Sequence, residues 1–529
     1  MPTDCISYQT SGYFSTLIQD YLDQKPALQS LYNHFPTLEN FEKQIAEKQA
    51  NFDHNNRIPL VETLKKQYQN IELSDASKQN IELLALENTF TITTGHQLNL
   101  FSGPLYFLYK IISTINLTKE LKSKYPSYNF VPVYWMATED HDFEEINYFN
   151  FKGKKFRWNK ESTGPVGRLS TVGLKEFLEI YAAELGSSTN ANVLKKLFEE
   201  AYLKHDNLAD ATRFLANSLF SNYGLVILDA DDADLKRAFI PYAEEELEKQ
   251  TSYKAVQKTI EKLTDYSVQV NPREINLFYI EDTLRERIIF ENDKYIVNNT
   301  LISFSKEEIF AELKNNPEKF SPNVIMRPLY QEIILPNLCY IGGGGEIAYW
   351  LELKSFFDAV NITFPVLLVR NSVLLATEKQ AKKADNLGLS WKDLFTKPAN
   401  LVNAITHKLS DFPIDLTAQK EILEKQFEYL YELANKTDQS FSGAVKAQEV
   451  KQKKGLDNLE KRLLKAQKRK LNDEIQRVTD LQLELFPSQS LQERQSNFSE
   501  FYLEKGEQLI PLLIQKLKPL ETNFNIITI

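Results

Sequence analysis

Four ionisable residues stand in succession shortly after an apolar segment, and their types suit proton transfer or the binding of an amine. They follow the segment 130–136 and are Glu139, Asp140, His141 and Asp142. Three carboxylates and an imidazole this close together repel each other and lose hydration unless a substrate, a cation or a counter-charge compensates them. Solvated surface turns also carry acidic runs, but seldom directly behind a buried strand. We therefore interpret the four residues as candidates for catalysis.

A metal site is the alternative interpretation of residues 139–142. Carboxylates and an imidazole can serve as metal ligands, yet neighbouring residues on one loop rarely all point inward, and no second histidine lies at helical spacing. We therefore expect general acid–base chemistry or the binding of a substrate amine here, and no metal.

The end of an expected buried strand, residues 89–94, carries the second candidate group. Glycine at the end of a strand lets a ligand approach the backbone, and the free N–H groups at the start of the following helix favour an anion. His96 and Gln97 could then hydrogen-bond a phosphate or a carboxylate, although a lone loop histidine is more often structural. The segment is not a Walker loop, because the Gly-Lys-Ser/Thr ending is missing. Its candidate residues are Gly95, His96, Gln97, Ser102 and Gly103.

Four consecutive glycines form the third candidate group. They lie between an expected strand, residues 339–341, and an expected helix that begins at Ile347. A plain linker would not be placed between a buried strand and an amphipathic helix, so close contact of the backbone with a ligand explains the glycines better. Glu346 is a candidate for binding an amine. The candidates in this group are Gly342, Gly343, Gly345 and Glu346.

An arginine leaves the end of the next expected strand, residues 365–369; it is Arg370, and Ser372 follows it. A guanidinium at this point suits bidentate recognition of a carboxylate. An ion pair with a neighbouring helix is an equally good account. Cys339 precedes the glycines, but its place in a strand predicts a packed thiol and not a nucleophile.

The order of strands and helices around these groups predicts an α/β fold with a doubly wound parallel sheet. The strand 89–94, the helix 105–117 and the strand 130–136 form a βαβ unit, which requires parallel strands. Strand–helix units recur at 223–246 and 339–369. Because ligands of open α/β sheets bind where the strands end, we expect the three candidate groups to share one cleft at one edge of the sheet.

Irregular segments interrupt this sheet, and a helical region follows it. Residues 149–158 predict a short antiparallel piece, 174–203 predict helix, and 268–304 predict a small antiparallel insert. From about residue 391 onward the chain is helical and charged.

The helical region predicts an antiparallel hairpin of long helices. Apolar residues recur mostly at steps of three or four over 456–485, which approximates a heptad seam that ends at Pro487. Apolar residues within 427–433 fall on the expected first arm. Basic residues outnumber acidic ones over 446–470; we interpret this stretch as a solvated coiled-coil face, and an RNA-contacting arm or the docking of a partner are the alternatives.

The composition of the 529-residue chain predicts a soluble, cytoplasmic protein. Hydrophobic residues make up 42% and charged residues 25%, and no run of about 18 apolar residues could span a membrane. The N-terminus shows no secretory signal pattern. The cysteines Cys5 and Cys339 cannot build a disulfide framework or a four-thiolate zinc site, which fits a reducing compartment. The net charge of −10 argues against nucleic acid as a partner of the whole surface.

Five segments of the chain, taken in order, resemble the BshC family of cysteine-adding enzymes in bacillithiol biosynthesis. They are residues 94–106, 132–147, 327–332, 342–350 and 491–494. The likeness covers nearly the whole chain, and several long motifs in the right order make it specific. Two positions depart from the family pattern: Gly344 stands where proline is usual, and His96 where glutamine is common. The resemblance adds Asn147 and Tyr349 to the candidates for substrate binding.

The resemblance implies a Rossmann-like core related to class I aminoacyl-tRNA synthetases, with connecting-peptide insertions and a coiled coil that supports a homodimer. The same kinship implies activation of a carboxylate by a nucleotide. The expected domains are residues 1–150 for the first half of the core, 151–320 for the insertions with some core elements, 321–385 for the second half of the core, and 386–529 for the helical coiled coil.

The activity that the resemblance implies is the last step of bacillithiol synthesis, in which L-cysteine is added to the amine of glucosaminyl-malate. A free carboxylate does not acylate an amine in water, so we expect ATP or another nucleotide to supply the driving force. Arg370 and the Gly95 loop are the candidates for binding malate, and one carboxylate of residues 139–142 would take the proton from the ammonium. A nucleotide-binding coiled-coil scaffold without catalysis is the alternative, and a tRNA-directed enzyme that uses residues 446–470 is a third hypothesis.

Overall fold

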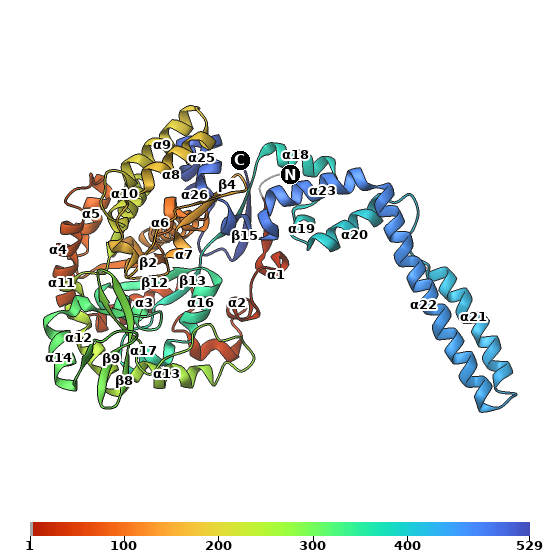
Figure 1. The fold of residues 1–529 in the computed structure, drawn as a ribbon, viewed down its shortest axis with the longest axis horizontal. Coiled ribbons are helices and arrows are strands. Elements are labelled where there is room, and N and C mark those ends of the chain that lie inside the picture. Colours follow the sequence, from red (N-terminus) through yellow and green to blue (C-terminus); the bar gives the residue numbers. More distant parts are fainter. Residues whose placement is uncertain (1–3) are drawn as a thin grey trace.

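A five-stranded parallel sheet lies at the centre of the computed structural model, which describes residues 4–529 (Figure 1). The strands, in their order across the sheet, are β13 (Val366–Val369), β12 (Asn337–Gly342), β2 (Thr89–His96), β3 (Asn129–Met136) and β6 (Val226–Asp229). Every neighbouring pair is parallel. The chain moves from β2 outward through β3 to β6, and then returns to the other side of β2 for β12 and β13. Such a switch in direction is where open α/β sheets bind ligands.

The central strands are buried on both faces, and the predicted α/β fold with a parallel sheet is confirmed. All eight residues of β2 and seven of the eight residues of β3 are buried. Their β-branched and aromatic side chains suit a strand that is covered on both sides. Helix α6 (Tyr106–Lys124) crosses from β2 to β3 and packs on both strands, and α3 (Asn40–Asn51) packs against β12.

Between β3 and β12 the chain forms the additional elements that the sequence predicted. The short hairpin consists of β4 (Tyr148–Phe151) and β5 (Lys154–Arg157). The predicted helical stretch divides into α8 (Leu174–Leu185) and α9 (Thr189–Tyr202). The antiparallel insert is a sheet of its own, whose strands in order are β10 (Ser303–Phe304), β9 (Lys294–Val297), β8 (Leu284–Glu291), β7 (Leu277–Glu281) and β11 (Phe320–Pro322).

Two predicted boundaries differ from the structure. Strand β6 begins later than expected, at Val226, because the residues before it form a 3-10 turn that ends at Gly224, whose φ is +78°. The helix predicted to begin at Ile347 begins at Gly344, inside the glycine run, as α16 (Gly344–Leu351). The last glycines of the run therefore form the first turn of a helix and not a loop.

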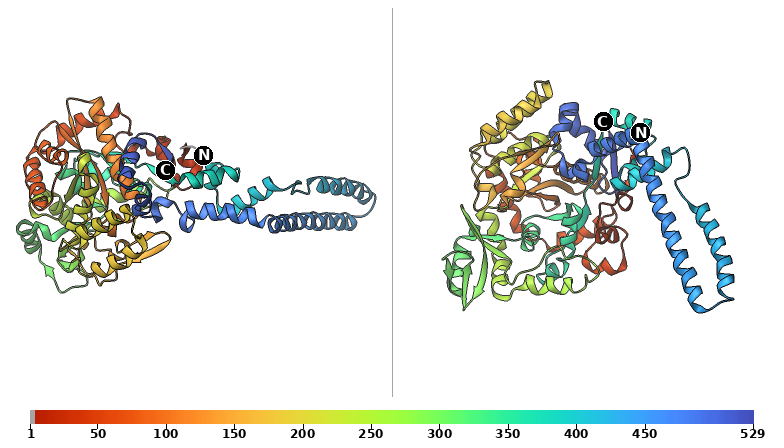
Figure 2. Two further views of the ribbon diagram at one scale, coloured as in Figure 1. Left: turned by 90° about the horizontal axis from the view of Figure 1, so that it is seen from above. Right: turned by 45° about the vertical axis from the view of Figure 1, so that its right-hand side comes forward.

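The two ends of the described chain meet in a second sheet beside the core. Its strands, in order, are β1 (Asp4–Ser7), β15 (Asn523–Thr528) and β14 (Ser372–Ala376). Figures 1 and 2 show the N and C ends close together at this sheet. Because β14 follows β13 directly in sequence, the second sheet joins the core to the C-terminal helices.

A helical hairpin projects from the body as a long arm (Figures 1 and 2). It consists of α21 (Thr417–Ala434) and α22 (Gln439–Lys470), with Phe427 and Val445 buried between them. The predicted antiparallel hairpin is thereby confirmed. Within residues 4–529, no helix combines the length and the apolar character that a membrane crossing requires.

The predicted heptad seam does not form one continuous contact. The helix is interrupted at Leu471, after which α23 (Asn472–Leu485) turns back onto the body. Leu485 is fully buried, and α23 packs against α20 (Pro398–Leu409). Leu459 of α22, by contrast, is 53% exposed. Apolar spacing predicts which residues share a helix face, but the neighbouring elements decide how much of that face is covered.

Candidate active site

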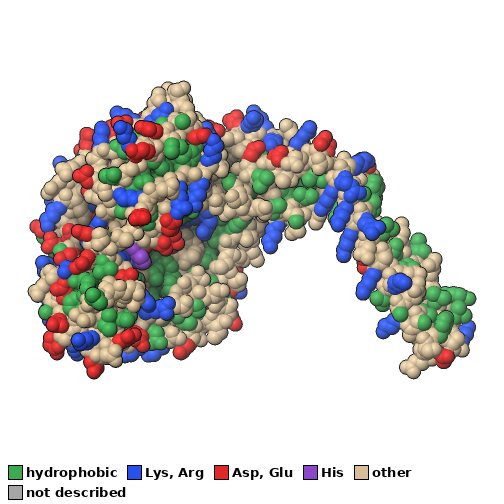
Figure 3. Space-filling model, viewed as in Figure 1, with side chains coloured by type: hydrophobic (Ala, Val, Ile, Leu, Met, Phe, Trp, Pro, Cys, Tyr) green, Lys and Arg blue, Asp and Glu red, His purple; other side chains and the backbone are tan. Residues whose placement is uncertain are grey.

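A pocket of about 700 Å³ opens where the strands of the parallel sheet end. Its walls come from the segments that follow β2, β3, β12 and β13, from the antiparallel insert, and from the short helix α24 (Gln492–Gln495) near the C-terminus. The face of the body seen in Figure 3 is hollowed, and acidic and basic side chains border the hollow. A pocket of this volume suits a small organic ligand with charged groups.

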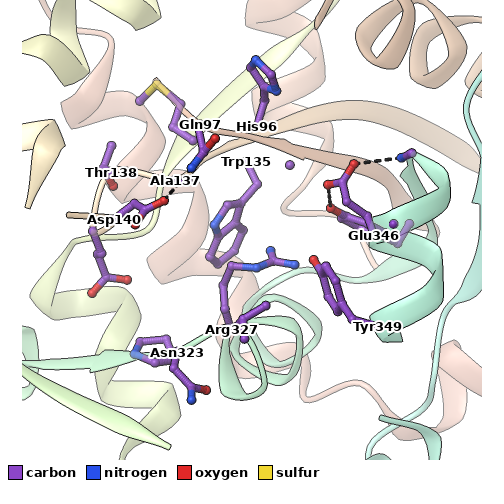
Figure 4. Close-up of a pocket in the computed structure, with 18 of the residues that line it drawn as sticks. His96, Gln97, Trp135, Ala137, Thr138, Asp140, Asn323, Arg327, Glu346 and Tyr349 are labelled. Carbon is purple, nitrogen blue, oxygen red and sulfur yellow. Dashed lines mark hydrogen bonds between the residues drawn. The ribbon is translucent and has the colours of Figure 1, made fainter. Parts of the chain in front are cut away.

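The pocket brings together residues from all three candidate groups (Figure 4). Ten residues that the sequence analysis selected line it: Gly95, His96, Gln97, Glu139, Asp140, Gly343, Gly345, Glu346, Tyr349 and Arg370. The carboxyl ends of neighbouring parallel strands lie at one edge of the sheet, which is why these distant segments meet. The cleft that the strand order predicts is present, whereas the roles of its residues stay predictions.

Seven selected residues lie outside the pocket: Ser102, Gly103, His141, Asp142, Asn147, Gly342 and Ser372. After Asp140 the chain turns outward, so His141 and Asp142 are exposed at the rim. Nδ1 of His141 accepts a hydrogen bond of 2.7 Å from Arg285 of the insert. Asn147 is buried at the end of a short helix, where Glu144 accepts a hydrogen bond from its amide.

The other four of these residues have structural surroundings. Ser102 and Gly103 form a buried turn, and the carbonyl of Gly103 accepts a hydrogen bond of 2.6 Å from an asparagine of the C-terminal helices. A Cβ atom on Gly342 would lie 2.9 Å from the Glu346 side chain, so this glycine makes room for that glutamate. The hydroxyl of Ser372 donates to a buried C-terminal glutamate. None of these contacts requires a ligand.

Glu346 is held as a carboxylate by three donors at the start of α16. Oε2 lies 2.6 Å from Nζ of Lys110 and accepts a hydrogen bond of 2.8 Å from the backbone N–H of Gly343; Oε1 accepts one of 2.8 Å from the Tyr340 hydroxyl. Burial by itself raises the pKa of Glu346, but Lys110 and the other donors outweigh burial, so the pKa lies below its ordinary value. A ligand amine would therefore have to compete with Lys110 for this carboxylate.

Lys110 is a site residue that the sequence analysis missed. It lies in an otherwise apolar stretch of α6, is 4% exposed, and donates a hydrogen bond of 2.7 Å to the carbonyl of Gly95. Burial lowers the pKa of Lys110, and the charge of Glu346 opposes this shift. A single lysine within an apolar helix is the signal that could have found it, because a buried ammonium needs a partner.

Glu139 is engaged in the pocket wall by a lysine that was not predicted either. Nζ of Lys236, which is 1% exposed, lies 2.5 Å from Oε1 of Glu139 and 3.2 Å from Oδ1 of Asp231. Burial raises the pKa of Glu139; Lys236 opposes the rise, and the nearby carboxylate of Asp231 adds to it. Glu139 therefore belongs to a buried network of charged groups and is not a free carboxylate.

Asp140 is the carboxylate of the cluster that remains open to the pocket. Its Oδ2 accepts a hydrogen bond of 3.0 Å from the amide of Gln97 (Figure 4), and its Oδ1 accepts one of 2.8 Å from the backbone N–H of His141. Among the described residues, no lysine or arginine forms an ion pair with it. A carboxylate without a fixed counter-ion can bind an ammonium group or accept its proton.

Three residues that line the pocket each carry a buried side-chain nitrogen atom that lacks a hydrogen-bond partner in the part of the chain that the structure describes. The three atoms are Nε2 of His96, Nη2 of Arg327 and Nε of Arg370. Burial, helped by the nearby Lys110 ammonium, lowers the pKa of His96 well below its usual value, so its imidazole is neutral near pH 7. Buried polar atoms without partners are costly, and these three atoms lie in residues that line one pocket.

Arg370 forms the buried ion pair that was the alternative to carboxylate binding. Its Nη2 lies 2.7 Å from Oε1 of Glu493, and the two residues are 3% and 1% exposed. Its Nη1 donates to the carbonyl of Asn371. Arg370 nevertheless lines the pocket, and its buried Nε has no hydrogen-bond partner among the described residues.

The wall opposite the sheet contributes arginines that sequence analysis did not select. Arg273, Arg285 and Arg287 line the pocket from the insert and the loop before it. Arg285 is fixed by hydrogen bonds to the β11 strand, and burial lowers its pKa. Arg327 lies with its guanidinium 5.7 Å from the ring centre of Trp135, and Figure 4 shows it in the middle of the pocket. These residues lie in different segments, so only the folded chain reveals them as a group.

The cysteine predicted to be packed is buried. Cys339 has no exposed surface, and burial raises the pKa of its thiol well above the usual value, which disfavours a nucleophilic role. Throughout residues 4–529, no three His, Cys, Asp or Glu side chains are grouped so that they could hold a metal ion.

Comparison with known families identifies the architecture. The model described as "Bacillithiol biosynthesis BshC, N-terminal Rossmann-like domain" matches residues 1–371, and that described as "Bacillithiol biosynthesis BshC, C-terminal coiled-coil domain" matches residues 373–529. The chain belongs to the BshC family. The resemblance carried by its motifs is thereby confirmed. The boundary between the two BshC domains falls between β13 and β14, where the parallel sheet ends and the second sheet begins.

BshC relatives match the chain along its length. A protein of Flavobacterium johnsoniae named "Putative cysteine ligase BshC" is 87% identical over 529 residues and is matched over 100% of both chains. Proteins of the same name from Flavobacterium psychrophilum and Bacillus anthracis are 64% and 27% identical, over 100% and 94% of this chain and 99% and 95% of their own. A solved structure titled as a putative arginyl-tRNA synthetase of Campylobacter jejuni covers 80% of this chain and 100% of its own at 12% identity, but its TM-score of 0.19 supports no argument.

Proposed function

We propose that this BshC-family chain is a cysteine ligase that joins the carboxyl group of L-cysteine to the amine of glucosaminyl-malate, in the last step of bacillithiol synthesis. Its relatives are named cysteine ligases, and its family models are named for bacillithiol biosynthesis. The observation that carries the proposal is the charge layout of the pocket, which has an open carboxylate, Asp140, after β3 and cations after β13 and on the insert. An amine acceptor that also carries two carboxylates needs both kinds of group.

Asp140 is the proposed proton acceptor. An ammonium group must lose a proton before its nitrogen can attack a carbonyl carbon, and a positioned carboxylate can take that proton. The Gln97 amide holds one oxygen of Asp140 at 3.0 Å, which orients the carboxylate toward the pocket. Glu139 is engaged by Lys236, and we assign it a structural part.

The malyl end of the acceptor is proposed to lie at the other end of the pocket, beside Arg370 and the Gly95 loop. Arg370 and His96 both line the pocket, and Nε of Arg370 and Nε2 of His96 are buried and lack partners within residues 4–529. Charge-assisted hydrogen bonds from a guanidinium suit a carboxylate. In this arrangement the acceptor lies along the strand ends, from β13 to β3.

A nucleotide, with ATP as the first candidate, is proposed as the source of the driving force. Its phosphates fit the donors of the insert, because Arg273, Arg285 and Arg287 line the pocket and guanidinium groups bind phosphate oxygens through paired N–H donors. The bound nucleotide would supply an activated cysteine carboxyl group. The chain's own contribution is to hold the acceptor amine and that group in reacting geometry.

We also propose that the chain acts in the cytoplasm as a homodimer held through the arm. The C-terminal family model is named as a coiled coil, and the arm exposes apolar side chains such as Ile422 (58%) and Tyr429 (62%). Both cysteines are free thiols in the structure, which fits a reducing compartment. A sedimenting mass of one chain at micromolar concentration would contradict the dimer.

The ligase proposal is tested by incubating the purified protein with L-cysteine, glucosaminyl-malate and ATP, and by following the thiol product by mass spectrometry. We expect cysteinyl-glucosaminyl-malate to form only when all three are present. Binding of nucleotide without product under any nucleotide condition would favour the scaffold hypothesis instead.

A further inference from the structure

The C-terminal domain closes one side of the pocket through the short helix α24. The Gln492 side chain forms two hydrogen bonds of 2.9 Å with the backbone of Leu375, and thereby attaches α24 to β14. Glu493 is 1% exposed and accepts hydrogen bonds from the backbone N–H of Val373 and from Arg370. The next residue, Arg494, lines the pocket.

Arg494 is an arginine with a fixed backbone and an unengaged side chain. Its backbone N–H donates to the carbonyl of Leu491, and the two residues before it are anchored to the core. The side chain is exposed and makes no hydrogen bond or ion pair within the described residues. Its charge acts on the hydroxyl of Tyr106, which also borders the pocket next to Arg370.

The core contributes unsatisfied donors to this end and to the middle of the pocket. Nε of Arg370 and Nη2 of Arg327 are buried and without partners in residues 4–529. The backbone at Gly343 lies close to Arg370: a Cβ there would be 3.7 Å from Nε, an ordinary van der Waals contact. The two ion pairs at this end, Lys110–Glu346 and the pair made by Arg370, are each neutral. Arg494 adds a positive charge at this end and Arg327 adds one in the middle of the pocket, while the Glu145 carboxylate, which acts on Tyr106 as Arg494 does, offsets part of them. The remaining positive charge favours a carboxylate ligand.

We propose that Arg494 of the C-terminal domain and Arg370 of the core together form a dicarboxylate subsite that holds the malyl group of the acceptor, with Glu493 as the residue that positions both. The identity of the acceptor rests on the proposed function. Arg494 offers a complete guanidinium fork to one carboxylate, while Arg370 offers Nε to the other. Glu493 fixes Arg370 through a buried ion pair. It fixes Arg494, its neighbour in sequence, through the backbone. The two domains thus complete one site.

Titration calorimetry with glucosaminyl-malate, in the absence of cysteine and nucleotide, tests the subsite. We expect Arg494→Ala to weaken binding about ten-fold or more, which is the scale of a lost charge-assisted contact, and Arg494→Lys to restore part of it. Methyl glucosaminide, which lacks carboxylates, should bind both proteins alike. Arg477→Ala, on an exposed face of α23, is the matched control and should bind glucosaminyl-malate like the unaltered chain.

Two outcomes would overturn the subsite. One is equal affinity of Arg494→Ala and the unaltered chain for glucosaminyl-malate. The other is weaker binding of ATP with unchanged binding of glucosaminyl-malate, which would make Arg494 a phosphate ligand. Failure of the proposed function looks different: glucosaminyl-malate would bind, and no thiol product would form.

The positioning role of Glu493 is tested by the kinetics of Glu493→Gln and Glu493→Asp. We expect the KM for glucosaminyl-malate to rise about ten-fold in Glu493→Gln, with an unchanged KM for cysteine, and Glu493→Asp to recover part of the loss. A fall in kcat with both KM values unchanged would contradict this role. If Glu493→Gln does not fold, the Arg494 variants decide the proposal by themselves.

Discussion

Two glutamates at opposite ends of the pocket, the buried Glu139 and the partly exposed Glu346, have the same kind of partner and opposite pKa shifts. Glu346 is paired with Lys110, and Glu139 is paired with Lys236. The pKa of Glu346 is lowered, because donors from Lys110, Gly343 and Tyr340 outweigh burial. The pKa of Glu139 is raised, because burial outweighs the single lysine and a second carboxylate lies nearby. The number and kind of neighbours, and not the residue type, set the charge of a buried carboxylate.

The difference agrees with the separate roles that we propose for the two ends of the pocket. At the β12 end, Glu346 is a fixed negative charge that anchors the glycine turn and Lys110, and the remaining cations are free for an anion. At the β3 end, Glu139 is held in a network, which leaves Asp140 as the group that can exchange a proton with a ligand. The proposed ligase uses the first end to hold the acceptor and the second to deprotonate its amine.

The largest expected effect is loss of catalysis when Asp140 is changed. Asp140→Asn keeps the hydrogen bond to Gln97 possible but removes the proton acceptor, so kcat should fall about 100-fold or more, the usual scale of general-base catalysis. Steady-state formation of the thiol product measures this. The affinity for glucosaminyl-malate should change far less. Asp265→Asn, at an exposed position outside the pocket, is the matched control; equal activities of the two variants would disprove the assignment.

A smaller effect, on stability, distinguishes the two glutamates. Glu346→Gln leaves the Lys110 ammonium buried without its counter-charge, with only neutral acceptors such as the carbonyl of Gly95, and should lower the free energy of unfolding by about 3 kcal/mol. Glu139→Gln leaves Lys236 with Asp231, and should cost about 1 kcal/mol or less. Urea denaturation of both variants gives the comparison. A larger loss of unfolding free energy for Glu139→Gln than for Glu346→Gln would show that the neighbouring groups do not set the difference between the two glutamates.

The contributions of Glu346 and Glu139 to the free energy of unfolding should change with pH in opposite directions. The free energy of unfolding rises with pH wherever the unfolded chain binds more protons. Because the pKa of Glu346 is lowered in the fold, its contribution is present above its ordinary value of 4.5 and is lost as the pH falls below it. Because the pKa of Glu139 is raised, its ionisation makes the wild type less stable as the pH rises above 4.5.

Denaturation at a series of pH values between about 3 and 7 tests these signs. The stability difference between the wild type and Glu346→Gln should shrink toward the acid end. The difference between the wild type and Glu139→Gln should shrink toward the neutral end. Parallel curves for the two variants would contradict the opposite shifts.

The smallest expected effect concerns His141, which the sequence placed among the catalytic candidates. The His141 side chain lies at the rim of the pocket and is 49% exposed. Its Nδ1 accepts a hydrogen bond from Arg285. His141→Ala should therefore reduce kcat/KM only about three-fold, through a less rigid Arg285. A loss as large as that of Asp140→Asn would show that the rim, and not the pocket, carries the proton transfer.

The core of the fold could be predicted from the sequence, because its signals are local. Apolar, β-branched runs predict β2 and β3, and strand–helix alternation predicts their parallel order. The glycine run after β12 is also a local signal, and it marks one wall of the pocket. The sequence does not predict how far the apolar seam of α22 and α23 is buried, because burial depends on whether another element covers it. Leu459 of α22 is exposed, whereas Leu485 of α23 is buried.

The site could be predicted only in part, because half of its charges come from segments with no local signal. Lys236, Arg273 and Arg285 are ordinary charged residues in the sequence and become pocket or wall residues only when the fold places them beside strand ends. Lys110 alone had a signal, since a lysine surrounded by apolar helix residues needs a buried partner. Residues close in sequence to a pocket-lining residue, such as Asp142 after Asp140, were selected by proximity, and the turn of the backbone excludes them from the pocket.

A crystal structure of the protein with glucosaminyl-malate tests the central claim most directly. The account predicts that the amine lies within hydrogen-bond distance of the Asp140 carboxylate and that the malyl carboxylates contact Arg370 and Arg494. A ligand bound in the reverse direction, or outside the pocket at the ends of the sheet strands, would contradict it.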